Sequence, residues 1–373
     1  LTAAPITSLA AWTPAEDGGN QLAIEGEPSN ADSGWFSDEG NASDTVDTAT
    51  GTDIYADDTV LDETNITVKD EEGIVYINEA NFPDAEFRRY LETEGIDFEL
   101  PEVDEDGNKY FYVSEVDSID IGGVRSSDSS YNIKSIKGIE LFTNLEGFSI
   151  SDRNRLDIKE VDLSANNQIN NVYINNKNIE SLKLPASSEI RLTLIEHSLK
   201  ALEFDNSTMF SVSVWKITPE LLQLLKGARI KILDLDDIGA NNFTGEIDLS
   251  GYTELEEVRI VNRGNVKVGG IKLGSLPKLR NLNAVGLKIS TLDVSGCTAL
   301  TYLNVSESDI SSIDVSKCTE LTDLVLQENV KLNSLDLSAL TKLATLDIAG
   351  CKNFSSLDIS KNTNLTKAWI YDT

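Results

Sequence analysis

A short pattern of apolar residues recurs at a nearly constant interval through the second half of this 373-residue chain. Leu300, Leu321 and Leu343 each begin the pattern Leu-x-x-Leu-x-apolar, and they lie 21 and 22 positions apart. Apolar residues two positions apart point to one side of a short strand, and one coil of about 21 residues cannot bury that side alone. Stacked coils can bury it, so the spacing predicts a solenoid whose strands form a parallel ladder.

Looser copies of this pattern extend the ladder toward the N-terminus, which gives eleven copies in all. The eleven copies begin at Leu145, Ile169, Leu192, Val212, Leu233, Leu255, Leu279, Leu300, Leu321, Leu343 and Leu365. The spacing Leu-x-x-Leu-x-Leu-x-x-Asn/Cys, complete over 321–329 and 343–351, is the leucine-rich-repeat signature. We therefore expect a leucine-rich-repeat solenoid: a curved parallel β-ladder of about eleven repeats over 141–373, with short extended or helical segments on its convex side. Thr218, Pro219 and Gly227 have the spacing of a capped helix there.

Charge divides the chain unevenly. Residues 1–72 carry 17 acidic residues and one basic residue, which is half of the formal net charge of −32. Low hydrophobicity with high charge does not offset the entropy cost of ordering, so 18–72 is predicted to be an acidic disordered linker. Residues 1–17 are predicted to be the remnant of a signal peptide, because they are apolar and uncharged up to Glu16; an ordinary apolar terminus is the alternative. The acidic composition argues against nucleic-acid binding, and the apolar runs are too short to span a membrane.

Residues 73–140 are predicted to form a small helical cap, because the end of a solenoid needs a polar cover. Asn81 is the expected helix cap, with Phe82, Phe87 and Leu91 on one side of the helix. From this segment onward the chain resembles bacterial secreted or cell-surface leucine-rich-repeat proteins of the internalin-like class. The resemblance covers 74–373. It implies export, no catalysis, and recognition of a protein or glycan by the concave face of the ladder.

One cap segment is similar to a calcium-binding loop. Asp104, Asp106, Asn108 and Glu115 occupy four oxygen-ligand positions of such a loop, but Lys109 stands where the loop needs a glycine. A bulky cation there opposes calcium binding, so we favour a cap turn without metal and expect no cofactor.

The second recurring pattern places an acidic residue in each of the last repeats. These residues are Asp293, Asp314, Asp336 and Asp358. Each lies between two inward apolar residues and so points outward. Stacking brings the carboxylates to about 5 Å from each other, and either a bound cation or solvation by water relieves the repulsion. We favour a solvated stripe, because exposed carboxylates are well hydrated, with the serine two positions on satisfying the turn.

The remaining reactive side chains are predicted to be structural. Cys297 and Cys318 share one phase of the repeat and Cys351 takes its Asn/Cys position, so all three are expected to be buried thiols rather than a disulfide. His197 is the only histidine and has no partner motif. Glu257, Asp234 and Asp236 near Arg259 are the one acid–base group on the predicted concave face, and we expect solvated charges there rather than an enzyme.

The concave face is the best candidate for binding, because side chains on a stiff ladder are already ordered. The candidate residues are Tyr173, Trp215, Asp234, Arg259, Asn283 and Asn304. We expect an exported, monomeric, non-catalytic protein at the cell surface or secreted, which binds a host protein or another surface macromolecule. A glycan-binding surface module and a passive structural spacer are the alternatives. Exposed aromatic rings suit either sugar rings or apolar anchors of a protein partner.

Overall fold

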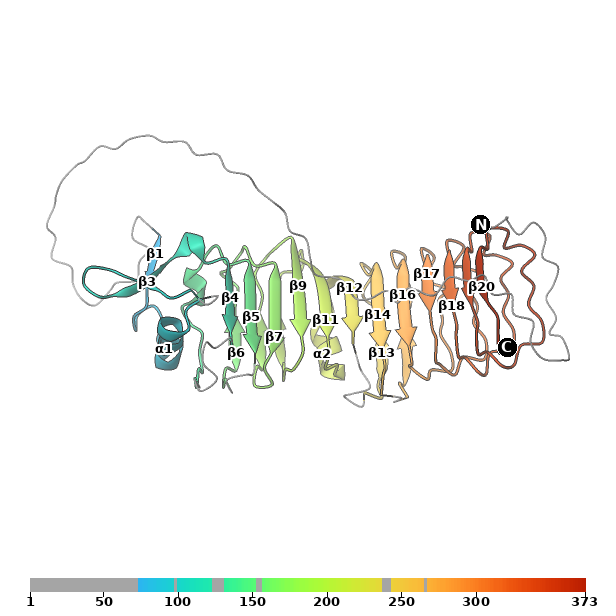
Figure 1. Ribbon diagram of the computed structural model, residues 1–373, viewed down its shortest axis with the longest axis horizontal. Helices are drawn as coiled ribbons and strands as arrows, with labels where there is room; N and C mark the ends of the chain where they lie inside the picture. The colour runs from blue at the N-terminus through green and yellow to red at the C-terminus, as the bar shows by residue number, and fades with distance from the viewer. Residues whose placement is uncertain (1–72, 97–98, 123–130, 152–155, 237–242, 265–266) are drawn as a thin grey trace, which may run out of the picture. The chain divides into compact units, whose positions relative to one another are not determined.

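The computed structural model describes residues 73–96, 99–122, 131–151, 156–236, 243–264 and 267–373. The predicted signal-peptide remnant (1–17) and acidic linker (18–72) therefore lie outside the described residues. Within the described ranges, twelve strands pair side by side into one sheet, and every neighbouring pair is parallel (Figure 1). In order they are β4 (Ser118–Ile121), β5 (Gly147–Ser151), β7 (Asn171–Asn175), β9 (Glu189–Leu194), β11 (Met209–Val214), β12 (Arg229–Leu235), β14 (Glu257–Val261), β16 (Asn281–Val285), β17 (Tyr302–Asn304), β18 (Asp323–Val325), β19 (Thr345–Asp347) and β20 (Lys367–Trp369).

The predicted leucine-rich-repeat solenoid is confirmed, and each of the eleven predicted copies supplies one strand. The strand pairs place Leu303 opposite Leu324, and Leu324 opposite Leu346. All three side chains are fully buried. The repeat interval of the sequence thus becomes a column of leucines inside the molecule. The sheet also has a twelfth strand, β4, which pairs with β5 and which the sequence pattern did not reveal.

Buried asparagines bind the backbone where one coil turns toward the next. The side-chain nitrogen of Asn329 donates to the carbonyls of Val305 (2.7 Å) and Leu326 (2.9 Å). Asn329 is fully buried, so these bonds satisfy carbonyls that no water can reach. Cys351 occupies the equivalent position one repeat later, and its thiol donates to the carbonyl of Leu326 at 3.2 Å. The three cysteines are free and buried, as predicted.

Two smaller parallel sheets form a second layer behind the large sheet (Figure 1). One holds β6 (Glu160–Asp162), β8 (Ser181–Lys183) and β10 (Ala201–Glu203), and the other holds β13 (Glu246–Asp248) and β15 (Gly270–Lys272). Their central residues Val161, Leu182 and Ile247 join the same hydrophobic core as the large sheet. The predicted helix is α2 (Pro219–Leu224), and the Thr218 hydroxyl accepts the Leu221 amide at its start. Among the described residues, no helix has the length and apolar character needed to cross a membrane.

The cap combines one helix with a small antiparallel sheet. The sheet has the order β1–β3–β2, built from β1 (Ile74–Tyr76), β3 (Lys109–Tyr112) and β2 (Glu102–Val103). Two short 3₁₀ turns, η1 (Val113–Glu115) and η2 (Ile139–Leu141), follow β3 and precede β5. Helix α1 (Ala85–Thr93) is capped by Asp84, whose side chain accepts the amides of Glu86 and Phe87. The prediction of Asn81 as the cap is wrong, because its side chain donates instead to the Tyr76 carbonyl at 2.9 Å.

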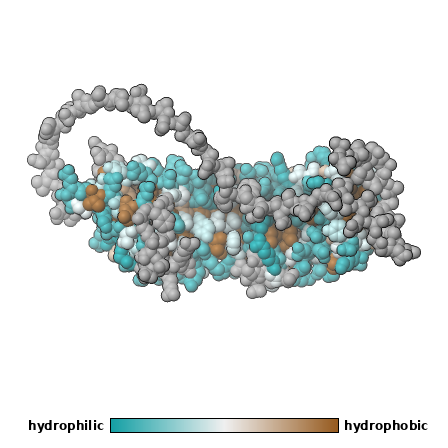
Figure 2. Space-filling view, viewed as in Figure 1, coloured by the Kyte–Doolittle hydropathy of each residue, from teal (hydrophilic) through white to brown (hydrophobic). Residues whose placement is uncertain are grey.

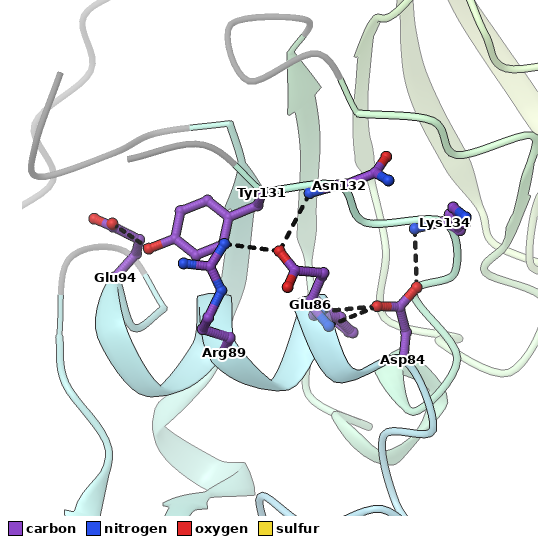
Figure 3. Close-up of polar contacts among 8 residues, drawn as sticks. Asp84, Glu86, Arg89, Glu94, Tyr131, Asn132 and Lys134 are labelled. Carbon is purple, nitrogen blue, oxygen red and sulfur yellow. Dashed lines mark hydrogen bonds and ion pairs between the residues drawn. The ribbon is translucent and has the colours of Figure 1, made fainter. Parts of the chain in front are cut away.

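Polar bonds attach α1 to the segment that leads into the repeats (Figure 3). The second carboxylate oxygen of Asp84 accepts the amides of Lys134 and Ser135, both at 2.9 Å. The Tyr131 hydroxyl donates to the carboxylate of Glu94, which is only 2 % exposed. Bonds between groups so far apart in the chain hold the helix over the first coil.

Candidate functional site

The strand register assembles the predicted binding residues on one face of the large sheet. We call the outward-pointing side chains of β4 to β20 the outer face; it is the face predicted to be concave. Successive strand pairs align one central residue per strand along it. This central column runs Tyr173, Thr193, Ser213, Asp234, Arg259, Asn283 and Asn304. Each is partly exposed between two inward neighbours, and adjacent strands lie about 4.8 Å apart.

Arg259 is the centre of an ion-pair network on the outer face. Its guanidinium nitrogens bond to Asp234 at 2.8 Å and to Asp236 at 3.4 Å, both on or next to β12. Arg263, which follows β14, contacts the same oxygen of Asp236 at 3.7 Å. The sequence placed Asp234 and Asp236 near Arg259, whereas Arg263 was not predicted because it lies outside the strand period. Two acids and two arginines therefore alternate over a small area.

Burial and pairing act in opposite directions on this network. Burial raises the pKa of Asp234, and the hydrogen bond from Arg259 offsets part of that rise. Burial lowers the pKa of Arg259, but its bonds to Asp234 and Asp236 outweigh this and raise the pKa overall. The Arg259 side chain is 38 % exposed. The guanidinium can therefore donate further hydrogen bonds while it stays bound to Asp234.

Trp215 stands beside this network in the neighbouring column. Backbone bonds from Trp215 to the Leu194 carbonyl (2.9 Å) and from Asp236 to the Val214 carbonyl (3.0 Å) continue the ladder past the strand ends. The register thus puts Trp215 next to Asp236. Its side chain is 47 % exposed, which makes it one of five large hydrophobic residues left on the described surface. Figure 2 shows hydrophobic residues in small separate groups among hydrophilic ones on the face turned to the viewer.

Two asparagines continue the central column beyond Arg259. Asn304 accepts the amide (3.0 Å) and hydroxyl (2.6 Å) of Ser306, which fixes its orientation. The side-chain oxygen of Asn283 is buried and has no hydrogen-bond partner among the described residues. Tyr173 lies at the other end, two strands before β11. The six predicted residues thus share one face over seven strands, with charge and aromatic surface concentrated near Arg259.

The calcium-like segment forms a turn between β2 and β3. One carboxylate oxygen of Asp104 accepts the amides of Asp106 (3.0 Å) and Asn108 (2.8 Å), and the other accepts the Asn108 side-chain amide. These hydrogen bonds lower the pKa of Asp104. Lys109 pairs with Glu92 of α1 at 3.2 Å. Two of the four suggested ligands thus bond to each other, and Glu115 lies after β3 in η1.

Each aspartate of the acidic column Asp293, Asp314, Asp336 and Asp358 lies in a tight turn. In each, the aspartate accepts the amide of the serine two positions later, as Asp314 does from Ser316 and Asp336 from Ser338, both at 2.9 Å. We expected the serine to supply the hydrogen bond to the backbone of the turn, whereas the aspartate side chain accepts the serine's backbone amide. Side-chain and backbone bonds from the serine lower the pKa of both aspartates. Within the described part of the chain, no three His, Cys, Asp or Glu side chains lie close enough to hold a metal ion.

Comparisons with known proteins concern the repeat architecture. No protein-family model matches the sequence, and no curated protein matches it. Among solved structures, the chain is similar to the functional domain of InlJ from Listeria monocytogenes, which includes a cysteine ladder. The two are 17 % identical, the match covers 80 % of this chain and 71 % of that one, and the TM-score is 0.39. It is also similar to the internalin InlF of Listeria monocytogenes (20 % identity, 78 % and 96 % covered, TM-score 0.33). A leucine-rich-repeat protein of Leptospira interrogans matches at 14 % identity (64 % and 76 % covered, TM-score 0.33). The second of these three structures is an internalin and the third is a leucine-rich-repeat protein, the class that the sequence resembles.

Proposed function

We propose that this protein is an exported, non-catalytic recognition protein that binds another protein, of a host or of a cell surface, through the outer face of its large sheet. The observation that carries the proposal is the grouping of Trp215 with the Arg259 network. Tryptophan and arginine are the residue types that dominate binding energy at protein interfaces. Here one is half exposed, and the other is held in place by two carboxylates.

The fold supports this role by lowering the cost of binding. Inward residues on both sides of each outward one are buried, as Leu233 and Leu235 are beside Asp234. A side chain fixed in this way loses little freedom when a partner binds, so more of the contact energy appears as affinity. The alternating charges of Asp234, Arg259 and Asp236 would select partners with a complementary pattern.

The proposal is tested by screening the purified chain against a panel of extracellular proteins and, in parallel, against a glycan array. A protein that binds the chain is then measured against Trp215→Ala and Arg259→Ala, each expected to weaken binding by about tenfold or more. The matched control is Lys183→Ala. Lys183 also contacts two acids, Glu160 at 3.8 Å and Asp162 at 3.5 Å, but on the second layer.

Each outcome of this screen has a clear meaning. Loss with both outer-face variants and full binding by the control support the proposal. Sugars as the only ligands, with quenching of the Trp215 emission, would show a glycan-binding module instead. A protein ligand that binds all three variants equally would place recognition elsewhere and contradict the proposal.

A further inference from the structure

The cap contains a hollow of about 330 Å³, and no residue of the Arg259 network lines it. It lies where the β2–β3 hairpin meets the chain just before β4, and Tyr110 and Tyr112 are among its lining residues. Both tyrosines are partly exposed. Its volume lies at the lower end of the range for ligand pockets, which leaves room for a single long side chain.

The two tyrosines lie on one face of the small antiparallel sheet of the cap. β3 is the central strand, and Tyr110 pairs with Tyr76 of β1 on one side and with Glu102 of β2 on the other. Tyr112 follows two positions later and so lies on the same face as Tyr110. The rings of Tyr110 and Tyr112 are 5.4 Å apart and nearly perpendicular, at 87°. The Tyr110 hydroxyl donates to Glu102 at 2.9 Å, which fixes the ring.

The charge of the hollow has one sign. Its lining includes four exposed carboxylates, from Glu99, Glu102, Glu115 and Asp117, and none of its lining residues is lysine or arginine. Lys109 is one position before Tyr110, so it points to the opposite face of the hairpin, where it pairs with Glu92. The negative charge is therefore left without a cation from the lining itself.

Leu100 gives the hollow an apolar edge. It lines the hollow and is 53 % exposed, one of the five large hydrophobic residues left on the described surface. Val103 of β2 is also exposed, but it pairs with Lys109 and so lies on the other face of the hairpin.

We propose that this hollow binds the side chain of a lysine or arginine presented by a protein partner. Perpendicular aromatic rings attract a cation through their electron-rich faces, and nearby carboxylates add direct pairing. The exposed Leu100 supplies contact for the aliphatic stem of such a side chain, which is how long basic residues bury their carbon atoms. Charge complementarity thus selects a basic residue over an apolar or acidic one. The hollow is a second contact surface, independent of the Arg259 network.

The test uses the full chain with its ten tyrosines carrying ¹³C-labelled rings. The signals of Tyr110 and Tyr112 are assigned with Tyr→Phe variants. The probes are N-acetyl-lysine methylamide and N-acetyl-arginine methylamide, and N-acetyl-norleucine methylamide serves as the uncharged counterpart. We expect saturable shifts of the Tyr110 and Tyr112 signals with the two basic probes, at dissociation constants on the order of millimolar, and none with norleucine.

Two pairs of variants with the same net charge separate a local site from a general field. Glu99→Gln with Glu102→Gln neutralises two lining carboxylates, and a glutamine at 102 can still accept the Tyr110 hydroxyl. Glu105→Gln with Asp106→Asn neutralises two exposed acids of the same hairpin that do not line the hollow. We expect the first pair to weaken probe binding by about tenfold and the second by less than about twofold. Unchanged thermal unfolding verifies that both fold.

A further variant tests the role of the ring. Tyr112→Phe should retain most of the binding, whereas Tyr112→Leu should lose about threefold or more, because only the ring attracts the cation. Three results would overturn the proposal. Two of them are equal shifts with the norleucine probe and equal weakening of probe binding by the two pairs of acid substitutions. The third is that calcium alone produces the same shifts and the basic probes do not compete with calcium.

Discussion

Replacing Leu324 by alanine should cost more stability than most single substitutions in this chain. Leu324 is fully buried, and it is paired along the ladder with Leu303 on one side and Leu346 on the other, both also fully buried. Backbone bonds of 2.9 Å from Val305 to the Val325 carbonyl and 2.7 Å from Leu326 to the Asp347 carbonyl fix the spacing of the coils. Leucine-to-alanine changes in cores cost about 2–5 kcal/mol, more where the cavity cannot collapse. We therefore expect about 3–5 kcal/mol.

Urea unfolding, followed through ¹⁹F-labelled tryptophan, measures this loss of stability at two positions in the ladder. Trp215 directly follows β11 and Trp369 lies in β20, so the two tryptophans are on opposite sides of Leu324 in the ladder. Because each coil contacts only its neighbours, the Trp369 transition should move to lower urea by more than the Trp215 transition.

Val325→Ala on the outward side of the same strand is the matched control, expected to cost under about 1 kcal/mol. A loss below about 1 kcal/mol for Leu324→Ala at the Trp369 signal would refute the stacked interior.

Three further predictions concern local features. Burial lowers the pKa of His197, so the unfolded chain binds more protons than the folded chain below about pH 6.5. The free energy of unfolding should therefore fall as the pH drops from 7.5 to 5.5. Urea titrations should show a smaller fall for His197→Gln over the same range. Burial raises the pKa of Cys297 to about 12 and those of Cys318 and Cys351 to about 11, so a thiol reagent at pH 8 should label none in the folded protein and three in urea, and rapid labelling of any one would contradict their burial. Thr218→Ala should cost about 1 kcal/mol by removing the cap of α2, while Thr218→Ser should be nearly neutral in the same urea assay.

The repeat interval predicted the strands because it reflects an interaction that every coil repeats. Leu303, Leu324 and Leu346 occupy one phase of the sequence and therefore one column of the core. β4 escaped this logic: Ile119 and Ile121 alternate as in a strand, but Ile119 lies 29 positions before its partner Phe148. Without the fixed interval, a short alternation does not stand out from chance.

The same reasoning explains what was predicted of the functional surfaces. Alternation and register were enough to place Tyr173 and Arg259 on one face. They could not show that Arg263, beyond the strand, reaches Asp236, because loop direction depends on local contacts. Helix α1 begins at Ala85, so Asp84 directly before it caps the helix rather than Asn81. The cap hollow depends on how the hairpin packs on its neighbours, which no period in the sequence reports.

A crystal structure of the chain would test the central claim most directly: stacked coils with one shared interior present a fixed outer face. The account predicts that Leu303, Leu324 and Leu346 lie above one another in the core, and that the Arg259 guanidinium sits between Asp234 and Asp236 with Trp215 alongside. Leucines displaced from this register, or an Arg259 side chain turned away from both carboxylates, would contradict it.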